Sequence, residues 1–242
     1  MTMYVVSHKA FQLPSESGYK PIYVGSSMRE KVAHEASFQK NIAEKNPYFC
    51  ELTALYAIWK HGQDEIVGIS HYRRFFAKKK RKGLLKYALK HQVYSESDWS
   101  HKLSGEYDLI LPSPMKLSSS VLLSYRKDHY LDDLLLVREI ISKGKPEGAY
   151  FFDQVMASGE FHGFNMLIAT KEVFHSYCSW LFPILFSLEE RLDLKSRSSY
   201  QQRVYGFIAE RLLDVWLLKE RSLSYLEVPT ITLNDKPFVR GI

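Results

Sequence analysis

Cysteine is scarce in this sequence, and long apolar runs are missing. The two cysteines, Cys50 and Cys178, lie in stretches with helical patterning, so their positions suggest neither a disulfide framework nor a zinc site. No uninterrupted apolar stretch approaches the roughly 20 residues that a membrane-spanning helix needs. The N-terminus enters residues 3–7 directly, without the charged region, apolar stretch and cleavage site of a signal peptide. We therefore expect a cytoplasmic protein.

Two familiar phosphate-binding patterns are also missing. The sequence has no Gly-rich loop of the Walker type, which argues against a phosphotransferase built on that loop. It has no Asp-x-Asp, a pattern whose carboxylates hold a divalent cation against a diphosphate. The nearest match, Glu96-Ser97-Asp98, precedes Trp99 in a polar stretch with no strand leading into it. We interpret that match as a helix start or a turn.

Acidic residues are absent from residues 66–95, which hold nine of the basic residues. The formal net charge of +6 is therefore local, and the rest of the chain is mildly acidic. No helix-turn-helix, zinc-finger or RNA-recognition pattern accompanies this region, so nucleic acid is the weaker explanation of the charge. Within 78–91, leucines and a tyrosine are mixed with the cations. This composition suits either a segment that lies against an anionic membrane face or a solvated basic loop.

Apolar patterning and helix-stop signals favour an alternation of strands and helices. A helix is expected over 46–62, capped by Asn46, with Pro47 in its first turn. Another helix starts at Lys171, and Pro183 should kink or split it. The expected strands are 4–7, 21–25, 66–70, 107–112 and 163–169, and the other expected helices are 118–142 and 199–218. This order predicts an α/β fold with a central mixed sheet flanked by helices and a helical C-terminal region, divided into a domain at 1–220 and a packed extension at 221–242.

The apolar run at 66–70 ends abruptly in His71, Tyr72, Arg73 and Arg74. In open α/β sheets, ligands bind beyond the carboxyl ends of the strands, and the planar guanidinium group binds phosphate oxygens in pairs. This strand end could therefore bind a nucleotide diphosphate. Because alternate side chains of a strand lie on opposite faces, one arginine could instead pack in the core. A surface salt-bridge pair is an equally open interpretation.

Four blocks of sequence, at 41–56, 67–75, 164–168 and 205–213, occur in this order. Together they resemble one family, the bacterial capsular and exopolysaccharide biosynthesis glycosyltransferases, which were long catalogued as a domain of unknown function. The resemblance runs from about Tyr4 to Trp216. It implies a sugar-nucleotide transferase with a GT-A-like fold, and some relatives transfer galactofuranose. The sequence departs from the family pattern at Gln39-Lys40, where an acidic residue is common, and at Ala57, where an aromatic residue is common.

The resemblance and the strand-end motif together suggest a donor site. Arg73 and Arg74 are assigned to the diphosphate, and His71 to a hydrogen bond or a proton at the leaving group. Asn165 resembles a Phe-Asn element that forms part of the donor-sugar pocket, although a backbone partner for its amide is equally open. Cationic side chains can stabilise a departing diphosphate without a metal, so we expect no cofactor. The other expected donor-binding residues are Tyr72, Asn41, Asn46 and Glu51.

Structural roles compete with donor binding at two of these positions. Asn46 would cap its helix whether or not it contacts a nucleotide. Glu51 lies in the first turn of the same expected helix, where a carboxylate is favoured by the helix dipole alone. The donor-binding role of Glu51 therefore depends on the family resemblance.

A transfer that inverts the anomeric carbon needs a base for the proton of the acceptor hydroxyl. His129 precedes two candidate acids by three and four residues on an expected helix, so the three side chains should share one face. Glu210 and Arg211 lie on a largely apolar helix, where they should pair with each other or reach into the cleft. The candidates for the base are Asp132, Asp133, Asp153 and His129, with His129, Asp133, Glu210 and Arg211 also considered as acceptor-binding or supporting residues.

We therefore predict a hexosyltransferase that moves a sugar from a nucleotide diphosphate donor, such as UDP-galactofuranose or another UDP-hexose. Its acceptor would be a glycan or a polyprenyl-linked saccharide in the synthesis of capsule, exopolysaccharide or lipopolysaccharide. The basic region would keep the enzyme near the inner face of the plasma membrane. The alternative is a basic membrane-surface or nucleic-acid binding protein without catalysis.

Overall fold

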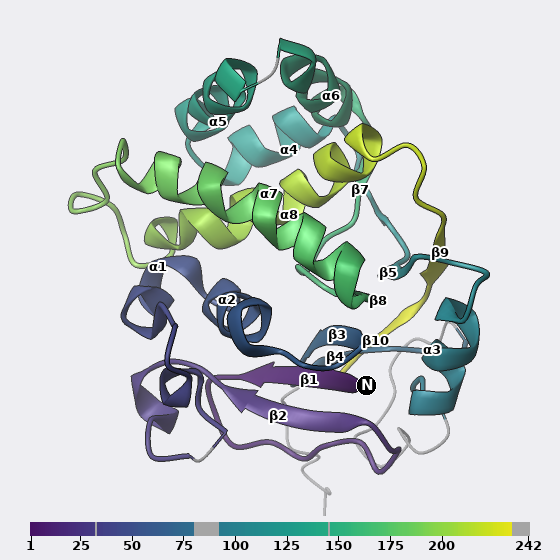
Figure 1. The fold of residues 1–242 in the computed structure, drawn as a ribbon. Coiled ribbons are helices and arrows are strands. Elements are labelled where there is room, and N and C mark those ends of the chain that lie inside the picture. The colour runs from purple at the N-terminus through teal and green to yellow at the C-terminus, as the bar shows by residue number, and fades with distance from the viewer. Residues whose placement is uncertain (32, 80–91, 145, 234–242) are drawn as a thin grey trace, which may run out of the picture.

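A mixed β-sheet forms the base of the molecule in a computed structural model that describes residues 1–31, 33–79, 92–144 and 146–233 (Figure 1). Strand β3 (Ile66–His71) lies inside this sheet, and all of its residues except His71 are buried. It pairs in parallel with β1 (Thr2–Ser7), which pairs in parallel with the edge strand β2 (Tyr19–Tyr23). The predicted strand at 66–70 is therefore confirmed as an interior strand, as its unbroken apolar character indicates.

On the side of β3 away from β1, the next two strands pair antiparallel. β3 pairs with β8 (Leu167–Thr170), which pairs with β5 (Leu109–Pro112). β3 also turns directly into β4 (Arg74–Phe76), so that His71 and Arg74 face each other across a tight turn. A separate small sheet joins β6 (Met115–Lys116) to β7 (Glu160–Phe161).

The segment that follows Arg221 contributes strands to the same sheet. β9 (Tyr225–Val228) runs parallel to β5, and β10 (Thr230–Thr232) runs antiparallel to β4. The expected C-terminal extension therefore supplies two strands of the sheet within its described part. The expected α/β fold with a central mixed sheet flanked by helices is confirmed.

The helices lie in layers above the sheet (Figure 1). α7 (Lys171–Glu189) and α8 (Val204–Lys219) pack on each other, and α5 (Leu131–Gly144) and α6 (Pro146–Ala157) cover them on the side away from the sheet. The remaining helical elements are η1 (Ser26–Met28), η2 (Glu35–Ser37), η3 (Ala43–Lys45), α1 (Asn46–Phe49), α2 (Leu52–His61), α3 (Glu96–Leu103), α4 (Val121–Asp128) and η5 (Gln201–Arg203).

The main hydrophobic core lies between the sheet and these helix layers. α8 runs through it and buries side chains around most of its circumference, among them Leu212, Val215 and Trp216. Phe182 of α7 stacks on Trp59 of α2 with ring centroids 5.4 Å apart. A helix that is apolar on nearly every side is buried in the interior, so the wide apolar surface of 199–218 is core, as the sequence favoured.

Three local predictions were wrong. The helix expected over 46–62 is broken at Cys50, whose φ is 53°, and Asn46 is not its N-cap. Asn46 instead donates from its side chain to the Cys50 carbonyl and the Thr53 hydroxyl, at 2.8 and 3.1 Å, which satisfies polar groups at the break. The helix expected at 118–142 is two helices, α4 and α5, that separate at His129. Asn165 lies before β8 rather than within a strand.

Other local predictions agree with the structure. Glu96-Ser97-Asp98 starts α3, where Ser95 and Asp98 form a capping box. In contrast, α7 is one unbroken helix with Pro183 inside it, so the split that was predicted there as one alternative does not occur. No helix of the described residues is long and apolar enough to cross a membrane. Most of the predicted basic segment at 78–91 lies outside the described residues, although Lys78 is described and pairs with Asp98 at 2.8 Å.

Candidate active site

The carboxyl ends of β1 and β3 meet at one edge of the sheet. The two strands run parallel with Val6 opposite His71, and the Tyr72 amide donates to the Val6 carbonyl at 3.1 Å. This is the kind of edge at which open α/β sheets bind ligands. The residues that emerge there are His8 and Lys9 after β1, and Tyr72 and Arg73 after β3.

Tyr72 is the centre of a cationic cluster at this edge. Its ring makes an edge contact with His8, with centroids 5.3 Å apart. The Lys9 ammonium lies 4.9 Å from the centroid of Tyr72, and the Arg73 guanidinium lies 5.2 Å from it. Since an aromatic ring attracts cations, Tyr72 gathers two positive charges in one place. We call His8, Lys9, Tyr72 and Arg73 the strand-end cluster, and its charge suits an anion such as a diphosphate.

His8 and Lys9 were not among the site residues predicted from the sequence. A signal was available, because this basic pair follows the first strand directly, just as the arginines follow β3. The pairing of β1 with β3 is what brings the two strand ends together, and that pairing joins residues more than 60 positions apart.

Next to this cluster, the chain before β8 adopts an unusual backbone conformation. Phe164 and Asn165 have φ values of 76° and 50°, a left-handed region that residues other than glycine rarely occupy. The Asn165 amide group donates to a Glu51 carboxylate oxygen at 2.7 Å and to the Gly206 carbonyl at 3.1 Å. The Phe164 amide donates to Glu210 at 2.9 Å. Strained backbone of this kind persists only where the surroundings hold it, and it gathers at functional sites.

His71 completes this group of polar residues. Its Nε2 lies 2.5 Å from the Phe164 carbonyl, so Nε2 carries the proton and donates. Burial lowers the pKa of His71, and the nearby Arg74 and Arg73 act in the same direction, while Glu51 and the carbonyl oppose them. The ring is therefore neutral at physiological pH and leaves Nδ1 as a proton acceptor. We call Glu51, His71, Asn165 and Glu210 the polar hub.

The two neighbouring arginines contact different aromatic rings. Arg73 belongs to the strand-end cluster, whereas the Arg74 guanidinium lies 4.2 Å from the ring centroid of Phe164, beside the polar hub. Burial lowers the pKa of Arg74, as does the charge of Arg73. The Arg74 Nε is buried without a hydrogen-bond partner among the described residues. Cationic charge therefore extends from the strand-end cluster to the hub.

One face of α8 holds the loop at 162–165 in place. Gly206, Glu210 and Asp214 are spaced by four residues, so they line up along that face. Asn165 bonds Gly206, Phe164 bonds Glu210, and the amide of His162 donates to Asp214 at 2.8 Å. The loop therefore runs along α8 in the opposite direction, with one hydrogen bond for each helical turn.

Glu210 is a half-buried carboxylate of the polar hub. Burial raises its pKa, and the nearby Glu51 adds to the rise, while Arg211 and Arg74 act against it. Arg211 donates to Glu210 at 2.8 Å and lies 4.5 Å from the ring centroid of Phe161. Glu210 and Arg211 therefore pair within the protein, one of the two arrangements that the sequence left open.

Comparison with known proteins identifies the family. Residues 2–221 match a family model whose description is domain of unknown function (DUF4422). The chain belongs to this family. Among solved structures, the apo structure of WbbM, a bifunctional glycosyltransferase, is similar with a TM-score of 0.86 and 24% sequence identity. That likeness covers 100% of this chain and 46% of the WbbM chain, so the DUF4422 chain spans less than half of that protein. No curated protein matches the chain.

Two predicted donor-binding residues of the DUF4422 chain hold turns in place. The side chain of Asn41 donates to the Phe38 carbonyl at 2.6 Å and accepts from the Ala43 amide at 3.1 Å. Asn46 holds the break between α1 and α2 and approaches Gly25, where an added Cβ atom would lie 2.9 Å from its Oδ1. Gly25 has a φ of 78°, so a side chain there would be strained as well as crowded.

The candidate acids are held in the helix layers of the DUF4422 chain. Asp133 is buried and accepts two hydrogen bonds from Arg197, at 2.6 and 2.8 Å. Asp153 accepts two from Arg138 at an exposed surface, at 2.7 and 2.6 Å. Asp132 is exposed on α5. The contacts among the described residues connect none of these acids with the polar hub.

His129 lies at the turn between α4 and α5, in an aromatic environment. Its ring stacks on Phe207 and Tyr200 with centroids 4.2 and 5.7 Å away. Burial lowers the pKa of His129, and the nearby Arg211 lowers it further. The hydrogen bond with Gln201 and the charges of Asp128 and Asp133 oppose this effect. Phe207 follows Gly206 in α8, so His129 lies close to the start of the helix that anchors the polar hub.

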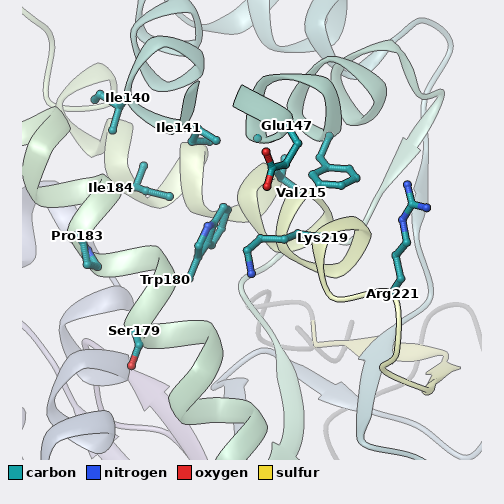
Figure 2. Close-up of a pocket in the computed structure, with 12 residues that line it drawn as sticks. Ile140, Ile141, Glu147, Ser179, Trp180, Pro183, Ile184, Val215, Lys219 and Arg221 are labelled. Carbon is teal, nitrogen blue, oxygen red and sulfur yellow. The ribbon is translucent and has the colours of Figure 1, made fainter. Parts of the chain in front are cut away.

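Two cavities lie outside the strand-end cluster and the polar hub. Among the residues that the structure describes, no group of three or more His, Cys, Asp or Glu side chains is arranged to hold a metal ion. A cavity of about 710 Å³ lies between α5, α6, α7 and α8, with apolar walls that include Ile140, Trp180 and Ile184 (Figure 2). A second cavity of about 530 Å³ adjoins His162 and Asp214, next to the loop that carries Asn165.

Proposed function

We propose that the chain is a glycosyltransferase that moves a sugar from a nucleotide diphosphate donor to a hydroxyl group of an acceptor. The observation that carries this proposal is the meeting of the strand-end cluster with the polar hub at the carboxyl edge of β1 and β3. The strand-end cluster offers cations for a leaving diphosphate. The polar hub offers hydrogen-bond acceptors for a sugar and a neutral imidazole that can take the proton of the attacking hydroxyl. The glycosyltransferase named among the solved structures, WbbM, has the same fold and supports this proposal.

Lys9 and Arg73 would bind the diphosphate. Negative charge grows on the leaving phosphate oxygen as its bond to the anomeric carbon breaks, and preorganised cations stabilise that charge. Both side chains already lie over the Tyr72 ring, at 4.9 and 5.2 Å from its centroid, so little reorganisation is needed when the donor binds. Arg74, beside Phe164, would add positive charge on the sugar side of the diphosphate. We propose that transfer proceeds without a metal ion.

His71 would act as the base. The acceptor oxygen forms a bond to the anomeric carbon, the bond from that carbon to the phosphate oxygen breaks, and the electron pair leaves with the diphosphate. The acceptor proton moves to Nδ1 of His71, because Nε2 is already protonated and bonded to the Phe164 carbonyl. Asn165 and Glu51 would contact the sugar hydroxyls, with the buried Asn165 Oδ1, which has no partner among the described residues, as the available acceptor.

The finer assignments follow the family resemblance. We propose a UDP-hexose, such as UDP-galactofuranose, as the donor, and cell-surface polysaccharide synthesis at the inner face of the plasma membrane as the setting. The rival interpretation, a basic binding protein without catalysis, depends on the basic segment at 78–91, most of which lies outside the described residues. Catalytic turnover of a nucleotide sugar separates the two.

The test is hydrolysis and transfer with a panel of UDP-, GDP- and dTDP-sugars, with release of the nucleotide followed by chromatography. Arg73→Ala and Lys9→Ala should each lower turnover by about tenfold or more while the thermal unfolding midpoint is kept. Arg126→Ala, an exposed arginine on α4, is the matched control and should turn over like the unchanged protein. Unchanged turnover in both cluster variants would remove the assigned diphosphate site.

Chelation tests metal independence separately. Turnover should persist in excess EDTA, because cations of the chain neutralise the leaving group. Complete loss that only a divalent ion restores would refute this part of the proposal and leave the donor site itself standing.

A further inference from the structure

Glu35 is a buried carboxyl group to which the proposed mechanism gives no role. It lies in η2 and is 0% exposed, and its Oε2 atom is buried without a hydrogen-bond partner among the described residues. The other oxygen, Oε1, accepts a long hydrogen bond from the Gly25 amide at 3.4 Å. A buried carboxyl group with so few partners is costly in its charged form, so a change in its proton should be felt by the groups around it.

The loop that follows β2 connects Glu35 with the strand-end cluster. Because β2 runs parallel to β1, this loop leaves the sheet at the same carboxyl edge as the cluster. In the loop, the Ser27 hydroxyl donates to the His8 carbonyl at 2.8 Å. Gly25, which has a φ of 78°, turns its amide toward Glu35. Glu35 therefore supports a loop that contacts the backbone of the strand-end cluster.

Thr53 connects Glu35 with the break between α1 and α2. The Thr53 side chain is buried, forms a hydrogen bond with Glu35, and donates to the Cys50 carbonyl at 2.9 Å. Cys50 is followed by Glu51, whose carboxylate accepts from Asn165 at 2.7 Å in the polar hub. A single hydroxyl group therefore lies between the buried carboxyl group and the backbone that carries Glu51.

The Thr53 hydroxyl has one proton to donate, and the charge of Glu35 decides where that proton points. Beside an ionised Glu35, the hydroxyl donates to the carboxylate, and the Cys50 carbonyl loses this donor. A protonated Glu35 donates to the Thr53 oxygen instead, which leaves the hydroxyl proton for Cys50. The Thr53 oxygen can accept from Glu35 and from the Asn46 amide group, at 3.1 Å, at the same time. The protonated form therefore completes the hydrogen bonds at the break.

We propose that Glu35 is a positioning residue for the transfer reaction, and that its protonated form holds Glu51 where it bonds Asn165. When Glu35 loses its proton to solvent, the Thr53 hydroxyl turns to the carboxylate and the break between α1 and α2 loosens. The donor sugar then loses its contact with Glu51. This inference rests on the proposed function and adds to it a group, remote from the substrate, that sets the pH range of donor binding.

The surroundings of Glu35 place its titration near neutral pH. Burial raises the pKa of Glu35 from its ordinary value of 4.5 to about 7, and the charge of Glu44 in η3 adds to the rise. The hydrogen bonds with Thr53 and with the Gly25 amide oppose it. His34, the N-cap of η2, accepts a backbone amide at Nδ1, so its Nε2 donates to the Gly25 carbonyl at 2.9 Å and the ring is neutral.

The first test compares Glu35→Gln with the unchanged protein across pH. Glutamine has the shape of a protonated glutamate and cannot ionise, and it offers an acceptor to the Gly25 amide and a donor to Thr53. With the nucleotide sugar that turns over best, KM of the unchanged protein should rise about tenfold between about pH 6 and pH 8.5, with kcat little changed. In Glu35→Gln, KM should stay low throughout. Glu44→Gln, the same change at an exposed neighbour, should keep the pH dependence.

Two substitutions at Thr53 test the connection itself. Thr53→Val removes the hydroxyl group, so KM should be about tenfold higher already at about pH 6 and should no longer change with pH. Thr53→Ser keeps the hydroxyl group and should restore both the low KM and its pH dependence. The thermal unfolding midpoint of each variant is the control for the fold, because Thr53 is buried.

Two further measurements do not depend on turnover. Because the folded pKa of Glu35 is raised, its contribution to stability is fully present below about pH 4.5 and is lost as the pH rises through about 7. The unfolding midpoint of Glu35→Gln should therefore rise relative to that of the unchanged protein between about pH 5 and pH 8.5. Over the same range, amide hydrogen exchange at 50–55, corrected for its intrinsic pH dependence, should quicken in the unchanged protein and not in Glu35→Gln.

The outcomes separate this inference from the proposed function. Values of KM and exchange that depend on pH in the unchanged protein and not in Glu35→Gln support the positioning role. A KM that is constant with pH in the unchanged protein, or that rises equally in Glu35→Gln, overturns it even when turnover is normal. A difference in the unfolding midpoint without a difference in exchange at 50–55 also overturns it, because Glu35 would then serve the fold alone. If no nucleotide sugar is hydrolysed or transferred, the proposed function fails and the role of Glu35 in transfer fails with it, while exchange still decides whether its proton controls the break.

Discussion

Two regions of the molecule hold charged side chains in two different ways. In the helix layers, Asp133 and Arg197 form a bidentate pair at 2.6 and 2.8 Å, and Arg197 also lies 4.6 Å from the ring centroid of Tyr130. At the sheet edge, the polar hub combines two carboxylates, an imidazole and an amide around the left-handed backbone of Phe164 and Asn165.

The difference between this ion pair and the polar hub lies in how completely their own polar atoms are satisfied. The pair of Asp133 with Arg197 uses both carboxylate oxygens, as a structural ion pair should. Beside the hub, Arg74 Nε and Asn165 Oδ1 are buried without partners among the described residues, and burial shifts the pKa of His71 and Glu210 toward their neutral forms. Unsatisfied hydrogen-bonding groups and a strained backbone in one place are typical of a ligand-binding site.

The largest effect is expected from Asp133→Ala. It leaves Arg197 as an uncompensated charge in a site where Asp133 is 1% exposed. We expect the free energy of unfolding to fall by about 3–5 kcal/mol, measured by urea titration. Turnover per folded molecule should stay unchanged. A drop in turnover that exceeds the loss of folded protein would instead connect Asp133 with the reaction.

A substitution in the polar hub should lower turnover rather than the free energy of unfolding. His71→Asn removes the proton acceptor, and turnover of the nucleotide sugar should fall by about 10²-fold or more, as for other general bases. Thermal unfolding, followed by circular dichroism, is the control for the fold. Transfer that is nearly normal in His71→Asn would show that another group takes the proton, with Glu51 the nearest carboxylate of the hub.

Two histidines should respond to pH in opposite directions. Burial lowers the pKa of His71, so its neutral form is kept until the pH falls below the ordinary pKa of histidine, and the acid limb of the turnover profile should lie there. For His162, burial favours the neutral form, but Asp214 and Glu227 outweigh it and raise the pKa.

The stability contribution of His162 is therefore fully present below its unfolded pKa of about 6.5 and is lost as the pH rises through its folded pKa. His162→Gln should remove this part of the pH dependence of unfolding, measured by urea titration between about pH 6 and pH 8. An unchanged pH dependence in that variant would show that His162 is not charged in the folded protein.

The smallest effect is expected from Asp153→Ala. Its two hydrogen bonds from Arg138 lie at the surface, where solvent screens ion pairs. We expect neither the unfolding midpoint nor turnover to change measurably. A clear loss of turnover would restore Asp153 as a candidate base and would mean that the acceptor binds next to α6.

Local patterning predicted most of the elements that frame the site. The apolar run that becomes β3, its abrupt end in charged residues, and the wide apolar surface of α8 were all visible in the sequence. The break at Cys50 was not, because its cause is the Asn46 side chain bonding to Cys50 and Thr53 rather than a proline or glycine. The helix-coil preferences of single residues do not report such contacts.

The sequence by itself determined which residues end the strands and which helices are core, since periodic burial and charge are written into neighbouring positions. Only the tertiary structure decided that Lys9 and Arg73 share one tyrosine ring, and that Glu51, Asn165 and Glu210 meet. Those partners are far apart along the chain. Strand pairing and the packing of the loop on α8 bring them together, and local propensity carries no information about either.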